Sequence, residues 1–264
     1  MPKTIIKVEN LIKTFNNRRV LDGINLEIYE GETFVIMGGS GCGKSTLLRH
    51  LTGAIIPDSG KIFIKDKDIT EASERQMDEI KKRFGMLFQS SALLDSLTVE
   101  ENVGLPLREH TRLAPDIIKI MVKMKLGLVG LRGFENHTPS ELSGGMKKRV
   151  GLARAIAMDP DIVFYDEPSA GLDPVVTAVI DKLMIDLSKK LLITSVVVTH
   201  DMNSVFRIAD RIAMLHKGKI MQIGTRDEIK NSANPIVQQF ISGNVEGPIQ
   251  FLSKGDDYLE QLTQ

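Results

Sequence analysis

The stretch Gly38-Gly39-Ser40-Gly41-Cys42-Gly43-Lys44-Ser45 decides the fold, because it directly follows the apolar run Thr33–Met37. It matches the phosphate-loop pattern of glycine, four residues, glycine, lysine and serine in every fixed position. We expect a buried strand, a glycine-rich turn and then a helix, with backbone N–H groups of the turn and the helix start pointing at a phosphate. The alternative is a glycine-rich turn that binds no ligand.

Two residues of this turn have expected roles in nucleotide chemistry. Lys44 reaches the β- and γ-phosphates, and the hydroxyl of Ser45 binds Mg²⁺. Cys42 is the only cysteine of the chain, which excludes an internal disulfide. Because Cys42 lies near a helix start, we expect its thiolate character to be raised. The full predicted nucleotide-binding set of the turn is Gly38, Gly39, Ser40, Gly41, Cys42, Gly43, Lys44, Ser45 and Thr46.

Composition narrows the class of protein. The 264 residues hold 34 basic and 34 acidic side chains, so no overall field favours a nucleic acid or an anionic membrane. No apolar run approaches the roughly 18 residues that a spanning helix requires. The N-terminus lacks the continuous apolar stretch of a signal peptide. We expect a soluble, cytoplasmic chain without a nucleic-acid partner.

The apolar pattern predicts an α/β fold with two kinds of sheet. Alternating apolar and polar residues predict half-buried strands in an antiparallel sheet at residues 4–9, 24–29 and 61–64. Continuous apolar runs, each followed by a polar loop, predict a buried parallel sheet formed by residues 33–37, 84–88, 162–165 and 195–198. Ligand chemistry in parallel sheets gathers at the carboxyl ends of the strands, and each catalytic motif below lies there or opens a helix.

Residues about 90–160 are predicted to form a mostly helical insertion. Thr98 begins a capping box, a second helix covers residues 115–126, and a third begins at Ser143. After Gly243 the core pattern ends. Residues 244–264 are predicted to form an extension with a short helix at 256–262.

An acidic pair follows the predicted strand at residues 162–165. Asp166 can complete the Mg²⁺ shell, and Glu167 can accept a proton from an attacking water. The alternative is that both carboxylates cap the next helix. Pro168 follows at once and holds Glu167 on a constrained turn.

Two further polar residues end predicted strands. His200 can donate a hydrogen bond to a γ-phosphate oxygen or orient the nucleophilic water. Gln89 can reach Mg²⁺ or the same water, although alone it would be an ordinary surface amide. Phe15 can stack on adenine, and its alternative is a core phenylalanine.

A second glycine turn, Leu142-Ser143-Gly144-Gly145-Met146, opens a basic helix. Ser143, Gly144 and Gly145 offer a second set of free N–H groups to a phosphate. A plain helix cap by Ser143 is the alternative, but it would need no glycine pair. One nucleotide cannot satisfy both turns of one chain, so we expect two copies to enclose ATP between them.

Together these residues resemble the nucleotide-binding subunit of ABC transporters over residues 4–243. The resemblance implies a P-loop NTPase (RecA-like) core with an antiparallel β subdomain and a helical subdomain. It also implies that Asp173 belongs to the D-loop, that Gln89 belongs to the Q-loop, and that two subunits pack head to tail. Met146 departs from the family, where many members carry Gln.

Shorter stretches resemble the Mla (Mce-type) lipid-transport ATPases, among them Phe88-Gln89-Ser90-Ser91-Ala92-Leu93 and Gly247-Pro248-Ile249-Gln250-Phe251. This resemblance implies an inner-membrane permease with a cytoplasmic ATPase, a periplasmic Mce-domain protein and a small STAS-domain partner. It implies that the C-terminal extension reaches the neighbouring ATPase subunit. A permease helix is expected to dock near Phe88, Leu93 and Leu94. The alternative is that these three side chains pack in the core of the chain.

The expected mechanism is closure of two subunits on ATP and opening after hydrolysis. The alternatives are an ABC ATPase for another substrate, a soluble ABC ATPase acting on DNA or ribosomes, and a scaffold that senses ATP without turnover. The chain lacks the long inserted arms and the second cassette that soluble members carry.

Overall fold

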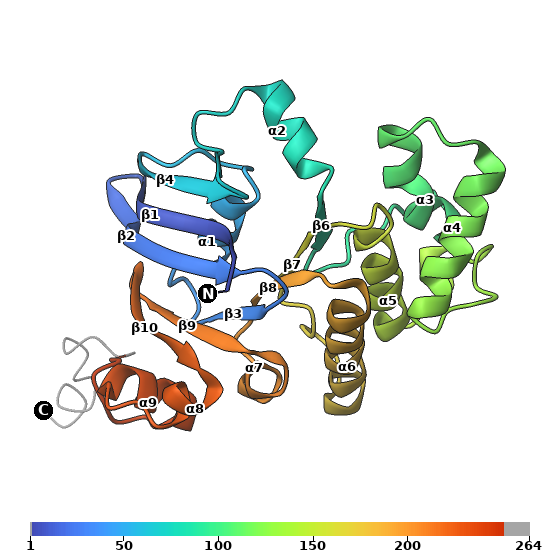
Figure 1. The fold of residues 1–264 in the computed structure, drawn as a ribbon. Coiled ribbons are helices and arrows are strands. Elements are labelled where there is room, and N and C mark those ends of the chain that lie inside the picture. The colour runs from blue at the N-terminus through green and yellow to red at the C-terminus, as the bar shows by residue number, and fades with distance from the viewer. Residues whose placement is uncertain (1, 251–264) are drawn as a thin grey trace, which may run out of the picture.

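The apolar run before the glycine turn is strand β3 (Thr33–Met37), which lies inside a six-stranded sheet of order β10-β9-β3-β8-β7-β6 (Figure 1). The computed structural model describes residues 2–250. The other strands of this sheet are β6 (Phe84–Leu87), β7 (Ile162–Asp166), β8 (Thr194–Val198), β9 (Arg211–His216) and β10 (Lys219–Thr225). Neighbouring strands run parallel except β9 and β10, as the continuous apolar runs predict.

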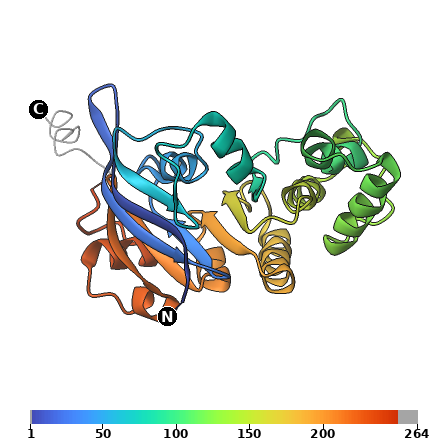
Figure 2. The ribbon, with the colours of Figure 1, turned by 45° about the horizontal axis from the view of Figure 1, so that its top comes forward.

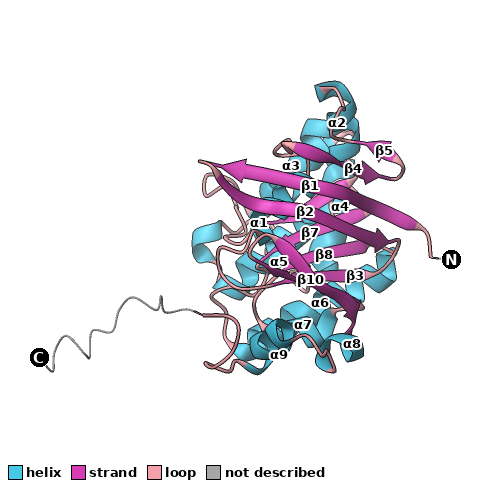
Figure 3. Cartoon of the chain, turned by 90° about the vertical axis from the view of Figure 1, so that its left-hand side faces the viewer, coloured by secondary structure: helices cyan, strands magenta, loops and turns pink. Residues whose placement is uncertain are grey.

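A second, four-stranded sheet is antiparallel and has the order β2-β1-β4-β5. Its strands are β1 (Thr4–Phe15), β2 (Arg18–Tyr29), β4 (Ser59–Ile64) and β5 (Lys67–Asp68). The predicted strands at 4–9 and 24–29 are the outer parts of two longer strands. Tight pairing of Phe15 with Arg18 extends them into one long hairpin, seen from the side in Figure 3.

Helix α1 (Lys44–Leu51) lies between the two sheets, because its apolar face packs with the antiparallel sheet and with one face of the six-stranded sheet. The side chains of β3 alternate between two cores. Phe34 and Ile36 join the core that contains α1, while Val35 and Met37 join the core on the opposite face. The glycine turn between β3 and α1 is therefore held by packing on both sides.

The opposite core is covered by α5 (Gly144–Ala155), α6 (Pro174–Leu191) and α7 (Met202–Ile208). Helices α3 (Val99–His110) and α4 (Pro115–Leu128) pack on α5 and extend away from the sheets in Figures 1 and 2. The predicted capping box at Thr98 is present, with Glu101 closing it. Proline opens α4, as the sequence predicts. A 3₁₀ turn (Pro139–Glu141) lies between α4 and α5. The short helix α2 (Glu74–Lys81) lies between β5 and β6 in the chain, and its Met77 belongs to the core that contains α1.

The chain ends in α8 (Arg226–Lys230) and α9 (Pro235–Ser242), and α9 closes on Gly243 in the left-handed conformation. Beyond Gly243 the side chain of Ile249 is buried, although it belongs to neither of the two apolar cores. The side-chain amide of Gln239 bonds both ways to Ile249, which is buried: the N–H of Ile249 donates to Oε1 at 2.7 Å, and Nε2 donates to its carbonyl at 3.1 Å. The helix expected at 256–262 lies outside the described residues.

A search of the helices within residues 2–250 finds none with both the length and the apolar character needed to cross a bilayer.

Candidate functional site

The glycine turn is shaped by neighbouring backbone. Gly38 has φ +154°, and a Cβ there would lie 2.1 Å from the carbonyl oxygen of Leu215. Gly43 has φ +112°, and its Cβ would lie 2.8 Å from the carbonyl oxygen of Val20. Only glycine fits at both positions, because of the left-handed φ and the close backbone approach. The strand-turn-helix geometry predicted for phosphate binding is present.

Lys44 is folded into this turn. It is only 8 % exposed, although it carries a charge. Its Nζ donates to the carbonyl oxygens of Gly38 at 2.7 Å and Gly39 at 3.1 Å. Ser40 and Gly41, by contrast, are exposed at the tip of the turn. The loop therefore positions an ammonium inside a shell of backbone groups, where an anionic phosphate would neutralise it.

Ser45 and Asp166 lie close together at the carboxyl ends of the strands. Ser45 is the second residue of α1, Asp166 ends β7, and the Ser45 hydroxyl lies 3.5 Å from Oδ1 of Asp166. Burial raises the pKa of Asp166, the charge of Glu167 adds to this rise, and Ser45 opposes it. A divalent cation would relieve this unfavourable charge.

A hydroxyl and a carboxylate are oxygen ligands that suit Mg²⁺, which is usually held by one or two protein groups together with phosphate oxygens. Residues 2–250 contain no group of three or more His, Cys, Asp or Glu side chains able to cage a metal. The donors at this point therefore fit a Mg²⁺ ion that arrives with a nucleotide.

Glu167 and His200 are bonded to each other. Nδ1 of His200 lies 2.9 Å from Oε1 of Glu167. Glu167 has φ +46°, which is uncommon for a residue with a side chain, and its N–H donates to the carbonyl of Val198 at 2.9 Å. Non-glycine residues in this conformation cluster at functional sites. The adjacent strands β7 and β8 thus bring the two predicted catalytic residues together.

Gln89 follows β6 and its side chain is exposed. Its backbone carbonyl accepts a hydrogen bond from Nζ of Lys148, a buried residue of α5. Sequence reasoning missed Lys148, which looked like one member of a basic run. The signal that could have singled it out is its helical spacing with the apolar residues Leu152 and Ala155, which are buried.

The second glycine turn begins α5. The Ser143 hydroxyl caps this helix by accepting from the N–H of Met146 at 3.3 Å, as the plain-cap alternative required. Packing gives a second reason for glycine at this turn. This holds for Gly145, where a Cβ would lie 2.6 Å from Cγ1 of Val176 in α6, but not for Gly144, where a Cβ would make an ordinary contact with Leu172 at 3.5 Å.

Asp173 caps α6 beside this turn, and its Oδ1 accepts from the N–H groups of Val175 and Val176 at 2.9 and 3.0 Å. Helix α5 packs on β6, α3 and α4, whereas α1 packs on β2, β7 and β8. The chain therefore does not bring Ser143, Gly144 and Gly145 together with its own phosphate turn.

Phe15 ends β1 and is 45 % exposed, so the alternative of a core phenylalanine is wrong. The ammonium of Lys13 lies 5.4 Å from the centre of its ring. An exposed ring that already attracts a cation on one side is free to stack on a planar base on the other.

The expectation of raised thiolate character at Cys42 is wrong. Its side chain is buried, and burial raises the pKa of the thiol, although Lys44 and nearby backbone N–H groups oppose the rise. Desolvation outweighs the helix start because the sulfur points into the core beneath the turn.

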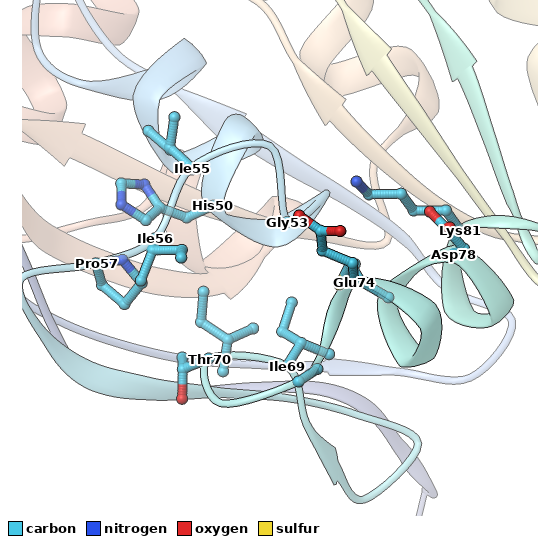
Figure 4. Close-up of a pocket in the computed structure, with 13 residues that line it drawn as sticks. His50, Gly53, Ile55, Ile56, Pro57, Ile69, Thr70, Glu74, Asp78 and Lys81 are labelled. Carbon is cyan, nitrogen blue, oxygen red and sulfur yellow. The ribbon is translucent and has the colours of Figure 1, made fainter.

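A separate cavity of about 380 Å³ lies beyond the C-terminal end of α1 (Figure 4). Ile55 and Ile69 line it together with Glu74, Asp78 and Lys81 of α2. None of the predicted nucleotide residues lines it. The candidate site is therefore defined by where the motif residues meet, at the carboxyl ends of β3, β7 and β8.

The phosphate turn after β3 lies close to the acidic pair at the end of β7 and to the histidine after β8. The second glycine turn lies apart from them, and together these features define an ATP-binding cassette. Residues 21–170 match the family described as ABC transporter. This chain belongs to the ABC transporter family.

Its relatives span nearly the whole chain. It is 42 % identical over 262 residues to the intermembrane phospholipid transport system ATP-binding protein MlaF of Haemophilus influenzae, covering 99 % of both chains. It is 41 % identical over 252 residues to the probable ribonucleotide transport ATP-binding protein mkl of Mycobacterium tuberculosis H37Rv, covering 96 % of this chain and 70 % of that protein.

A solved structure has the same fold. It is the dimeric, post-hydrolysis ATP-binding cassette MJ0796 bound to ADP and Pi, with a TM-score of 0.78 and 33 % identity. The match covers 84 % of this chain and 99 % of that one.

Proposed function

We propose that this chain is the ATP-hydrolysing subunit of a transporter that moves phospholipid between two membranes. The observation that carries the proposal is the 42 % identity to MlaF across 99 % of both chains, which continues past residue 170, where the family match ends. Residues 4–243 would form the cassette, with a helical subdomain at about 90–160. Residues 244–264 would form an extension that contacts the neighbouring subunit.

Two copies would assemble head to tail around ATP. Within one chain the exposed Ser143 and Gly144 begin a helix that packs mainly on β6, α3 and α4, which supports their contribution to the site of a second copy. The dimeric form of MJ0796, described with ADP and Pi, supports this arrangement. We propose that Lys44 and His200 hold the γ-phosphate from one side, and that Ser143 and Gly145 of the partner subunit hold it from the other.

Hydrolysis would use groups that already lie together. Ser45, Asp166 and Gln89 would hold Mg²⁺, which shields the phosphate charge and orients the γ-phosphate when bound. Glu167 would accept the proton of the attacking water, and the 2.9 Å contact with His200 holds its carboxylate in place before ATP binds. Loss of the shared γ-phosphate removes the charge that holds the two copies closed.

The membrane subunit would dock beside Gln89. A cavity of about 610 Å³ runs from Ser45 and Asp166 to Phe88, between α1, α2 and β6. Phe88 and Leu94 are 45 % and 46 % exposed, which supports a docking role, whereas the side chain of Leu93 packs against the core. A permease helix in this cavity would lie beside Ser45, Asp166 and Phe88, the residue that precedes Gln89 in the chain.

The likeness to the phospholipid transport protein supports a proposal for the individual partner proteins. We propose a transmembrane permease, a periplasmic Mce-domain lipid-binding protein and a small cytoplasmic STAS-domain protein, with this chain peripheral on the cytoplasmic face of the inner membrane. Ribonucleotide transport is the second candidate, because mkl is 41 % identical.

The test is a phosphate-release assay on the purified complex of this chain with its permease, compared with Glu167→Gln. We expect Mg²⁺-dependent ATP hydrolysis in the wild type and phospholipid bound to the purified complex. Extraction of bound lipid, and of bound ribonucleotide other than the ATP and ADP that the cassette itself holds, separates the two cargo classes in one preparation. A complex that hydrolyses ATP but retains such a ribonucleotide and no phospholipid would overturn the cargo assignment. A wild-type complex that hydrolyses no ATP would overturn the whole proposal.

A further inference from the structure

Lys148 is a buried cation at the meeting point of three motifs. It lies on α5 and is only 4 % exposed. Its Nζ donates to the backbone carbonyl of Gln89 and, at 3.4 Å, to the backbone carbonyl of Glu167. One ammonium thus connects the helix capped by Ser143 with the segment that follows β6 and with the first residue after β7.

This position is unfavourable for a lysine in isolation. Burial lowers the pKa of Lys148, while the charges of Asp166 and Glu167 oppose the shift. None of the ion pairs found in residues 2–250 includes Lys148, so the two carbonyls are its hydrogen-bond partners there. A buried ammonium that donates to backbone carbonyls holds that backbone in place. If the backbone moved away, the ammonium would lose its hydrogen-bond partners.

Glu167 needs such support. Its φ of +46° is a strained conformation that persists only where surrounding contacts determine it. Three contacts hold its backbone: its N–H donates to Val198, and its carbonyl accepts from Ala170 at 3.1 Å and from Lys148. The contact to Val198 comes from the neighbouring strand β8, and the contact to Ala170 comes from the turn that Glu167 begins. Only the contact to Lys148 comes from the helical part of the chain.

We propose that Lys148 is a positioning residue for ATP hydrolysis, fixing the turn that aims Glu167 and linking that turn to α5. The proposal rests on the ATPase function above. Lys148 follows Ser143 by five residues on one helix, about 7.5 Å along its axis. When a nucleotide bound to the partner subunit pulls on the start of α5, the ammonium moves with the helix and shifts the backbone of Gln89 and Glu167.

The experiment compares Lys148→Met with Lys148→Arg and with Lys125→Met in the full-length complex. Lys125 is a matched control, since it is another buried lysine of the helical part, 7 % exposed, whose partner is Asp159. We expect Lys148→Met to lower kcat by roughly 10- to 100-fold, since small misplacements of a reacting group have effects of this size. The Kd for ATP should stay within about threefold, and Lys148→Arg should recover part of kcat, because the guanidinium can still donate to both carbonyls. Lys125→Met should keep kcat once corrected for the folded fraction.

A double variant decides whether Lys148 acts through Glu167. In single-turnover assays, Lys148→Met added to Glu167→Gln should cause no further loss, because the group being positioned is already disabled. A further loss equal to that seen in the wild type would overturn the proposal, and so would an unchanged kcat in Lys148→Met. If Lys125→Met lowers kcat as much as Lys148→Met does, loss of any buried lysine explains the effect and the proposal is wrong. Absence of ATP hydrolysis in the wild type would instead overturn the proposed function.

Discussion

Nδ1 of His200 lies 2.9 Å from Oε1 of Glu167, so the proposed water-activating carboxylate is held by the residue proposed to contact the γ-phosphate. The glutamate side chain is only 13 % exposed, whereas the histidine side chain is 68 % exposed. The buried member of the pair is therefore fixed, and the exposed member is free to exchange this contact for a phosphate oxygen.

Replacing Glu167 with Gln should lower turnover by about 10²–10⁴, the usual contribution of a general base. The amide keeps an oxygen for His200 and nearly the same volume, so ATP affinity should be largely unchanged. Phosphate release and nucleotide binding, measured on the same preparation, check both statements. Turnover within a few-fold of the wild type would show that Glu167 is not the base.

The positions of the motifs were readable from the sequence because they depend on local pattern. The apolar run before Gly38, the proline that opens α4 and the capping box at Thr98 each require only neighbouring residues, and each is found as predicted. Contacts between distant residues were not readable. The approach of Val176 to Gly145 joins two helices, and only packing brings them together.

The burial of individual polar side chains could not be predicted from the sequence either. In the sequence, Lys148 is one member of the basic run that follows the second glycine turn. The position of Cys42 near a helix start predicts raised thiolate character. Both lie beneath the surface, because the segments that cover them come from other parts of the chain. The acidic pair was readable only as a pair; the bond between Glu167 and His200 depends on β7 and β8 being neighbours in the sheet.

Gly145→Ala tests whether this position needs glycine for packing against Val176, for the proposed backbone contact with ATP, or for both. Its Cβ would lie 2.6 Å from Cγ1 of Val176, and overpacking of this kind typically costs about 1–3 kcal/mol. We expect a lower Tm and loss of ATPase activity. Adding Val176→Ala removes the clashing methyl group and should restore Tm, but not activity, because the backbone would still be screened from a phosphate. Thermal melts and phosphate release of both variants give the answer. Full recovery of activity in the double variant would remove Gly145 from the proposed contact with ATP.

Phe15→Ala should weaken ATP binding by about 2- to 12-fold, the equivalent of 0.5–1.5 kcal/mol for an aromatic stack. The ring is exposed, so the fold should not depend on it. The KM for ATP measures the effect, and inhibition by inorganic tripolyphosphate is the control, since that ligand carries no base. Equal weakening of ATP and tripolyphosphate would mean that Phe15 acts on the loop instead of the adenine.

Cys42 should react slowly with alkylating reagents at neutral pH. Burial raises the pKa of its thiol and also blocks access, so both the thiolate fraction and the exposure are low. Mass spectrometry after timed labelling should show slow modification of the folded chain, slower still with ATP, and rapid modification in denaturant. Labelling that is fast without ATP would mean that the phosphate turn opens far enough to expose the sulfur.

Asp181 should make stability depend on pH. It is fully buried in α6, and its Oδ2 accepts from Ser204 at 2.8 Å and from Arg207. Its Oδ1 has no hydrogen-bond partner among residues 2–250. Burial raises the pKa of this carboxyl above its ordinary value of 3.8, the charge of Asp201 adds to the rise, and Ser204 and Arg207 oppose it. The folded chain therefore binds the proton more tightly than the unfolded chain does.

It follows that the free energy of unfolding decreases as pH rises from the unfolded pKa through the higher folded one, and the loss is complete above it. Asp181→Asn removes the charge, so it should raise Tm at pH 8 by roughly 2–4 °C, the equivalent of about 1 kcal/mol in a chain of this size. The advantage should shrink in acid, where the folded wild type already holds the proton. Asp186→Asn, on the same helix but half-buried, is the matched control and should not raise Tm at pH 8, because this carboxylate is still reached by solvent. A lower Tm for Asp181→Asn at pH 8 would mean that the ion pair with Arg207 outweighs the cost of burying the carboxylate.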